Sequence, residues 1–227
     1  AAGSRRHRPV ASPPVTTLAW TFAALAALLG LADWWAVWTG RRAVRWVTKP
    51  GALAALIGVA VALEPFDDGV RRWMVIGLVL SLAGDVFLLG SERWFVGGLA
   101  SFLLGHIAYV VAMQTQFDSV PGLVAGLAFV AGALAVVARR LVASVAGGAH
   151  RELVGPVVAY VAVISAMVVA AFGTGAPWAI GGAVLFYVSD ATLAWNRFLE
   201  PRRFGPLAVM VTYHLAQAGL VGWLVTG

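Results

Sequence analysis

Eight apolar runs, each near the length that crosses a lipid bilayer, constrain this sequence more than any other feature. A transmembrane helix needs about 20 mostly apolar residues, and all but the marginal second run are long enough to span. Gly and Pro lie between the runs, and the ten-residue alternation of a transmembrane barrel is absent. The sequence therefore predicts an all-α polytopic membrane protein, a bundle of eight transmembrane helices. The runs cover about residues 18–38, 50–64, 73–90, 95–115, 120–138, 153–172, 177–196 and 206–226.

The composition leaves no room for a separate soluble domain. Of the 227 residues, 61% are hydrophobic and 11% are charged, whereas about 25% of a soluble domain is charged. We expect a flexible basic arm at residues 1–17, which lacks the pattern of a signal peptide, and a membrane domain at residues 18–227. The sequence contains no Cys, which excludes disulfides, thiolate nucleophiles and Cys-ligated metals.

The Lys and Arg residues are distributed unevenly between the two ends of the predicted bundle. Eleven of the 16 lie in odd-numbered loops, and the positive-inside rule then places these loops in the cytoplasm and both termini outside. A bacterial cytoplasmic membrane is the expected location. The net charge of +6 is assigned to topology and to contact with membrane lipids, because no nucleic-acid module is visible.

Two aspartates lie where a membrane helix rarely carries a charge. Asp85 and Asp190 fall about 10 Å inside the bilayer, counted at about 1.5 Å per residue from Ser91 and Arg197. An ionised Asp at the centre of a membrane helix costs about 2.5–3.5 kcal/mol, so each needs a partner, a proton or a function. Their surroundings, Gly-Asp-x-x-Leu and Ser-Asp-x-x-Leu, suggest two four-helix repeats.

Further polar side chains fall at the same depth or at helical spacing from the aspartates. The simplest interpretation is that they satisfy one another by hydrogen bonds between helices, and the alternative is a substrate site. Asp33, close to a helix end, is assigned an interfacial or structural role. The predicted substrate-binding residues of this layer are Ser81, His106, Tyr109, Tyr187, Ser189, Tyr213 and Gln217.

Three residues near predicted cytoplasmic helix ends are candidates for contact with a lipid phosphate. Lys49 is expected at headgroup level, with Pro50 in the first turn of the second helix. Asn196 and Arg197 lie at the end of the seventh helix. The alternative for Lys49 is a snorkelling anchor, and for Arg197 a charge that only sets topology.

Sequence motifs of several other enzyme classes are missing. The chain contains no GxSxG, P-loop or HExxH pattern, which removes the usual carriers of serine-hydrolase, nucleotide and zincin chemistry. His106, His214, Asp85 and Asp190 have the right atom types for zinc. Because no spacing motif supports that set, we predict no metal ligands.

The polar motifs also carry a family resemblance. They are Lys49-Pro50, Ser81-Leu82-Ala83-Gly84-Asp85, Gly105-His106, Tyr187-Val188-Ser189-Asp190, Arg197-Phe198 and Tyr213-His214-Leu215-Ala216-Gln217. In order and spacing, over about residues 31–225, the sequence resembles the YhhN family of lysoplasmalogenase-like membrane proteins. The resemblance implies a cofactor-free, eight-helix hydrolase that cleaves the vinyl ether of a lysophospholipid, the lysoplasmalogen. The products would be a fatty aldehyde and glycerophospho-ethanolamine or -choline, with Asp85 and Asp190 as the catalytic residues.

Vinyl ether hydrolysis suits a pair of carboxyl groups. An acid protonates the alkene carbon, water adds to the resulting oxocarbenium ion, and glycosidases handle a similar cation with two carboxyl groups. We expect one Asp to donate the proton and the other to stabilise the cation, and the sequence does not assign which is which. It does not indicate an oligomeric state either. The alternatives are a lipid or small-molecule transporter with a proton-handling Asp pair, and a metal-assisted hydrolase of another lipid.

Overall fold

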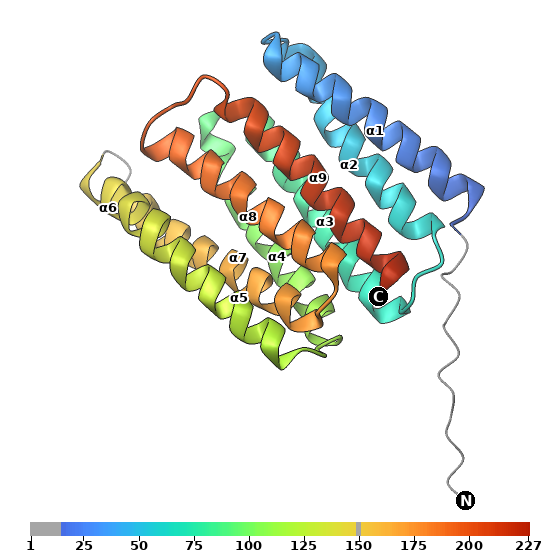
Figure 1. Cartoon of the computed structure of the whole chain (residues 1–227). Coiled ribbons are helices and arrows are strands. Elements are labelled where there is room, and N and C mark those ends of the chain that lie inside the picture. Colours follow the sequence, from blue (N-terminus) through green and yellow to red (C-terminus); the bar gives the residue numbers. More distant parts are fainter. Residues whose placement is uncertain (1–14, 149–150) are drawn as a thin grey trace, which may run out of the picture.

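The computed structural model describes residues 15–148 and 151–227 as a bundle of helices, and these ranges contain no strand (Figure 1). Eight segments are long and apolar enough to cross a membrane, which confirms the predicted all-α membrane class. The α-helices are α1 (Thr17–Trp38), α2 (Arg42–Ala62), α3 (Asp68–Leu89), α4 (Phe95–Gln114), α5 (Val120–Ala133), α6 (Arg139–Gly147), α7 (Val154–Thr174), α8 (Pro177–Phe198) and α9 (Gly205–Thr226).

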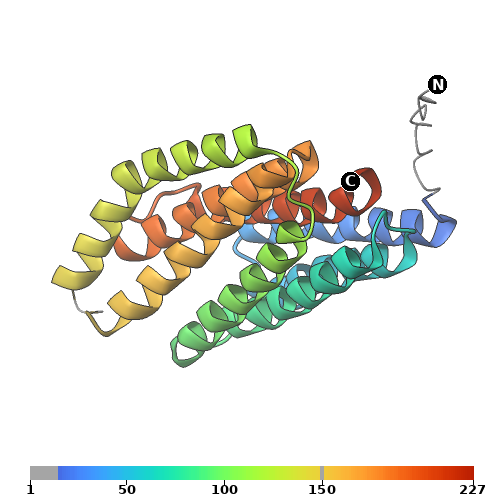
Figure 2. The same cartoon turned by 90° about the horizontal axis from the view of Figure 1, so that it is seen from below.

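Helices that follow one another in the chain form the main packed pairs. α1 packs on α2, α3 on α4, and α8 on α9, while α4 also contacts α7. α9 lies against α1, α2 and α3 as well, so it occupies the centre of the bundle (Figures 1 and 2). The side chains of Leu220, Trp223 and Leu224 on α9 are fully buried. α5 packs mainly on α7 at the margin, which leaves most of its surface for lipid.

Glycines let the two helix pairs that carry the aspartates pack closely. A Cβ on Gly105 of α4 would lie 3.0 Å from the carbonyl oxygen of Gly77 on α3. A Cβ on Gly182 of α8 would lie 2.9 Å from the backbone nitrogen of Leu220 on α9. Small residues permit such backbone contact in membrane bundles. The repeat that relates the two pairs stays a prediction.

The second helix differs from the sequence prediction. It begins at Arg42, so Pro50 lies inside the helix and not in its first turn. Lys49 is 4% exposed and lies about 10 Å along the helix from Arg42, so its predicted headgroup position is wrong. The mixed polar segment before Pro50 hid the helix, because backbone hydrogen bonds extend a helix through polar residues that find partners inside the bundle.

The fifth run is longer than predicted, and the other boundaries agree closely. α5 continues through a π-helical turn (Leu134–Ala138) into α6, which forms one long segment. The expected basic arm falls mostly on residues 1–14, which lie outside the described residues; α1 begins at Thr17 with the Thr16 side chain as its N-cap. α1 begins and α9 ends at the same end of the bundle (Figure 1).

Candidate active site

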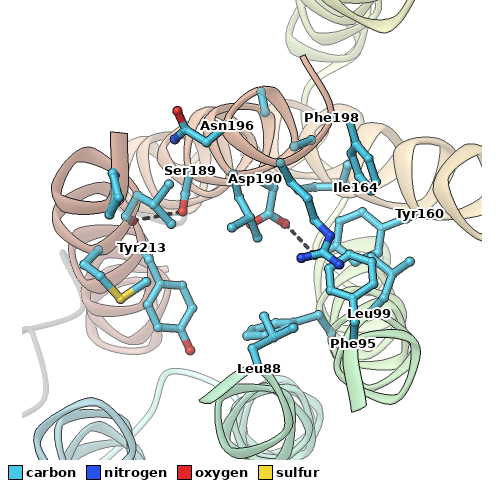
Figure 3. A pocket seen from close by; sticks show the side chains of 18 of the residues that line it. Leu88, Phe95, Leu99, Tyr160, Ile164, Ser189, Asp190, Asn196, Phe198 and Tyr213 are labelled. Carbon is cyan, nitrogen blue, oxygen red and sulfur yellow. Dashed lines mark hydrogen bonds between the residues drawn. The ribbon is translucent and has the colours of Figure 1, made fainter. Parts of the chain in front are cut away.

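A cavity of about 280 Å³ opens among the helix ends opposite to the start of α1 and the end of α9. Its wall includes the last turns of α3 and α8 and the first turns of α4 and α9. Asp85 and Asp190 both line it, so the structure brings together the two aspartates predicted to act as a pair. Figure 3 shows Asp190 and Tyr213 directed into a hollow that is otherwise walled by Leu88, Phe95 and other apolar side chains.

Asp85 is held on both carboxylate oxygens. Lys49 Nζ lies 3.0 Å from Oδ1, and the Tyr213 hydroxyl donates a hydrogen bond of 2.8 Å to Oδ2. The Asp85 side chain is 0% exposed and that of Lys49 only 5%, so this ion pair is removed from water. A buried carboxylate needs such partners to offset its lost hydration. The pair joins α2 to α3, and Tyr213 adds α9.

A chain of polar side chains continues behind Asp85. The Tyr109 hydroxyl donates to Gln217 Oε1 at 2.8 Å, and Gln217 Nε2 donates to the Tyr213 hydroxyl at 3.4 Å. Ser81 Oγ lies 3.5 Å from the Tyr109 hydroxyl. Because the Tyr213 oxygen accepts from Gln217, its single proton is directed to Asp85. Ser81, Tyr109 and Gln217 do not line the cavity, so their position suits orientation of Tyr213.

Asp190 has a different kind of partner. It is half-buried, and its Oδ2 accepts a hydrogen bond from the hydroxyl of Tyr160 on α7. Among the described residues, the structure records no ion pair to Asp190. The sequence prediction missed Tyr160, although a tyrosine in an apolar run needs a partner for its hydroxyl. That signal could have selected it beside Tyr109.

The two histidines of the predicted layer lie apart from the cavity surface. His106 is 1% exposed, and its ring packs edge-on against Phe186 with 4.6 Å between centroids. Neither ring nitrogen has a hydrogen-bond partner among the residues described. His214 Nδ1 accepts from Trp34 Nε1 at 2.9 Å. Within the described part of the chain, no three His, Asp or Glu side chains are grouped to hold a metal, so the conceivable zinc set is not assembled.

The remaining predicted contact residues lie around the cavity and its mouth. Tyr187 and Ser189 line the cavity, and the Ser189 hydroxyl donates to the Val209 carbonyl at 3.0 Å. Arg197 lines it too, as does Asn196, whose side-chain oxygen accepts from the Arg202 backbone nitrogen at 3.0 Å. The cavity thus collects these four residues with both aspartates.

Asp33 has a structural role inside the bundle. It is 0% exposed, and its Oδ1 accepts from Thr48 Oγ1 at 3.0 Å and from Arg45 Nε at 3.4 Å. The interfacial alternative is therefore wrong. The contacts link α1 to the early part of α2, the segment that precedes Pro50.

Comparison with known proteins identifies the family. The YhhN family matches residues 44–224, which is most of the chain and includes every residue of the cavity. The protein belongs to the YhhN family. No solved structure matches the chain.

Curated relatives of this YhhN family member are named lysoplasmalogenases. Human lysoplasmalogenase TMEM86B is 29% identical over 196 residues, which cover 84% of this chain and 80% of that protein. Human lysoplasmalogenase TMEM86A is 33% identical over 150 residues, covering 63% of this chain and 60% of the relative. The lysoplasmalogenase of Mycobacterium tuberculosis is 32% identical over 175 residues, which cover 75% of this chain and 66% of that protein. The chain thus spans less than two thirds of the length of the latter two.

Proposed function

We propose that this YhhN family protein is a membrane hydrolase that cleaves the vinyl ether of lysoplasmalogens. The observation that carries the proposal is Asp190, a carboxyl group held by Tyr160 in an apolar cavity whose wall also contains the Lys49–Asp85 pair. The lysoplasmalogenase relatives support the same substrate class. The products would be a fatty aldehyde and glycerophospho-ethanolamine or -choline.

The unequal partners of the two aspartates support different roles for them. Lys49 favours the ionised form of Asp85, whereas the recorded partner of Asp190 is a neutral hydroxyl. Tyr160 occupies Oδ2 of Asp190, which leaves Oδ1 to hold a proton toward the substrate. Asp190 is therefore the acid. Both carboxylate oxygens of Asp85 are already engaged, so it acts by holding Lys49 and Tyr213 at the cavity wall.

The reaction then runs in three proton-balanced steps. Asp190 gives its proton to the alkene carbon beyond the ether, and positive charge spreads over the adjacent carbon and the ether oxygen. The new Asp190 carboxylate stabilises this oxocarbenium ion, as carboxylates do in glycosidases. Water adds to the carbon bonded to oxygen, and the proton it releases restores Asp190. The resulting hemiacetal separates into aldehyde and glycerol hydroxyl.

The position of the cavity suits a single-chain lipid. Leu99, Ile164 and other apolar side chains can contact the hydrocarbon near the reacting bond, while Arg197 lies at the mouth. The mouth is at the end where most Lys and Arg residues lie, so we propose that it faces the cytoplasmic leaflet of a bacterial inner membrane. Neither a cofactor nor a metal is part of the proposal.

Aldehyde formation from a defined lipid tests the proposal. Purified protein is incubated with an alkenyl lysophospholipid and with the saturated alkyl ether of the same length, and the aldehyde is reduced and measured by mass spectrometry. In D₂O, protonation at carbon should place one deuterium next to the former carbonyl. Asp190→Asn should lose activity at least 1,000-fold and Asp118→Asn, a change at an exposed loop carboxylate, should not.

Four results would contradict the proposal. An Asp190→Asn protein that is folded and fully active would remove the proposed acid. Product without deuterium at that carbon would exclude the protonation step. Movement of unchanged lipid across a sealed vesicle would instead favour a transporter, and activity restored by zinc after chelation would favour a metal-assisted hydrolase.

A further inference from the structure

A second hollow extends the cavity at its mouth. It measures about 370 Å³ and is lined by residues of the α3–α4 connection, among them Ser91 and Glu92. Its wall shares Leu88, Phe95, Leu193, Asn196 and Arg197 with the deep cavity, so the two spaces adjoin. A molecule that reaches Asp190 from the helix ends therefore passes this charged mouth.

An ion pair between Arg197 and Glu92 spans the mouth. Arg197 Nη2 lies 2.5 Å from Glu92 Oε2, and the two side chains are 25% and 82% exposed. The guanidinium also stacks on Phe95, with 3.8 Å from its carbon to the ring centroid. An exposed ion pair contributes only about 0–1 kcal/mol, so another pair of opposite charges can replace it at little cost.

Among the described residues, the other two cations of the cavity wall are less available to a ligand. Lys49 is paired with Asp85, and Arg45 with Asp33, and both carboxylates are 0% exposed. Taking either cation away would leave a buried carboxylate without its charge partner, which costs several kcal/mol. Arg197 is thus the cavity-lining cation whose partner can return to water.

The distance between the acid and this cation suits a glycerol phosphate. Arg197 follows Asp190 by seven residues, so both leave the same face of α8 about 10 Å apart along its axis. Asp190 protonates the alkene carbon two bonds beyond the ether oxygen. Phosphorus lies seven bonds from that carbon, about 8 Å when extended at roughly 3.5 Å per three bonds. The length of the Arg side chain covers the difference.

We propose that the mouth is a headgroup subsite for a zwitterionic phosphoethanolamine or phosphocholine. The phosphate takes Arg197 from Glu92, and Glu92 then meets the ammonium group of the same headgroup. One internal ion pair is exchanged for two, so no charge is left without a partner. This inference rests on the proposed function for its substrate, but it concerns binding and can be measured without hydrolysis.

Binding of uncleavable lipids tests the subsite. The three probes are alkyl ethers of glycerol with equal chain length, which are titrated into purified protein in detergent. One carries phosphoethanolamine on the glycerol, the second carries only phosphate, and the third, the plain glycerol, carries neither. We expect the lysophosphoethanolamine to bind most tightly. Glu92→Gln should weaken it about tenfold, the size of one charge-assisted contact, and leave the glycerol phosphate unchanged or tighter. Arg197→Gln should weaken both phosphate lipids about tenfold but not the plain glycerol.

Matched controls and outcomes make the result decisive. Glu200→Gln and Arg203→Gln change exposed charges at the same end of the bundle outside both hollows, and should alter none of the three Kd values. Equal Kd values for the three lipids, equal effects of Glu92→Gln on all of them, or no binding at all would overturn the subsite. The expected binding pattern without aldehyde formation from any alkenyl lipid would instead refute the hydrolase and leave the subsite in place.

Discussion

The buried pair of Lys49 and Asp85 allows a sharp test of how the site is held together. The perturbation is Lys49→Met, which keeps most of the length of the side chain and removes its charge. In the structure the Lys49 ammonium group lies 3.0 Å from the carboxylate, and the two side chains are 5% and 0% exposed. After the change, Asp85 would keep only the Tyr213 hydroxyl as a partner.

The expected loss of stability follows from that burial. Breaking a buried ion pair by removing one partner costs about 3–5 kcal/mol, because the other group stays desolvated. For a chain of this size, 1 kcal/mol shifts Tm by about 2–4 °C, so Tm should fall by about 6–20 °C. Arg71→Met breaks an exposed pair with Asp68, whose side chains are 33% and 77% exposed, and should cost at most about 1 kcal/mol.

Thermal unfolding in detergent measures these changes, and a double-mutant cycle isolates the pair. Asp85→Leu alone should destabilise about as much as Lys49→Met, because it leaves the cation unpaired. The double variant should recover most of the lost stability, since replacing both partners with apolar groups removes the desolvation cost. Aldehyde formation should stay lost in all three variants.

Two results would refute this reasoning. A Tm for Lys49→Met within 2–3 °C of the wild type would mean that water solvates Asp85 and that the pair is not buried. A double variant less stable than both single variants would mean that the two side chains stabilise the bundle independently. In either case Asp85 would lose its assignment as the ionised partner.

Three further changes test other parts of the site. Tyr160→Phe removes the hydroxyl that donates to Asp190. It should lower kcat about 10–100-fold, measured by kinetics, and cost about 1 kcal/mol of stability, measured by thermal unfolding. Gly77→Ala should destabilise the bundle by about 1–3 kcal/mol in thermal unfolding, because the new Cβ would lie 2.2 Å from an aromatic ring of α4. Gly181→Ala is the control: its new Cβ meets no atom within 4 Å, so the stability should not change. Leu99→Trp adds bulk to the cavity wall and should weaken lipid binding in a titration without lowering Tm. Unchanged binding would mean that the lipid binds elsewhere.

The sequence alone determined the membrane class, most helix boundaries and the two aspartates. Apolar runs of bilayer length report the helices directly, because lipid cannot hydrogen-bond an exposed backbone. An Asp inside such a run stands out for the same reason, and depth counting placed Asp85 and Asp190 at one level. The prediction is wrong where polar residues belong to a membrane helix. It assigns Lys49 to the headgroups, because Arg42 and Arg45 hide the start of α2.

Which polar groups become partners depends on how the helices pack. Helical spacing gives the face of one helix, but Lys49, Asp85 and Tyr213 come from three helices, and their contact depends on how these pack. The same holds for Tyr160 and Asp190, which are joined by the approach of α7 to α8. From the sequence alone the two carboxyl groups are equivalent. The ion pair of Asp85 and the hydroxyl partner of Asp190 arise from their neighbours in space, because charge interactions depend on distance and burial.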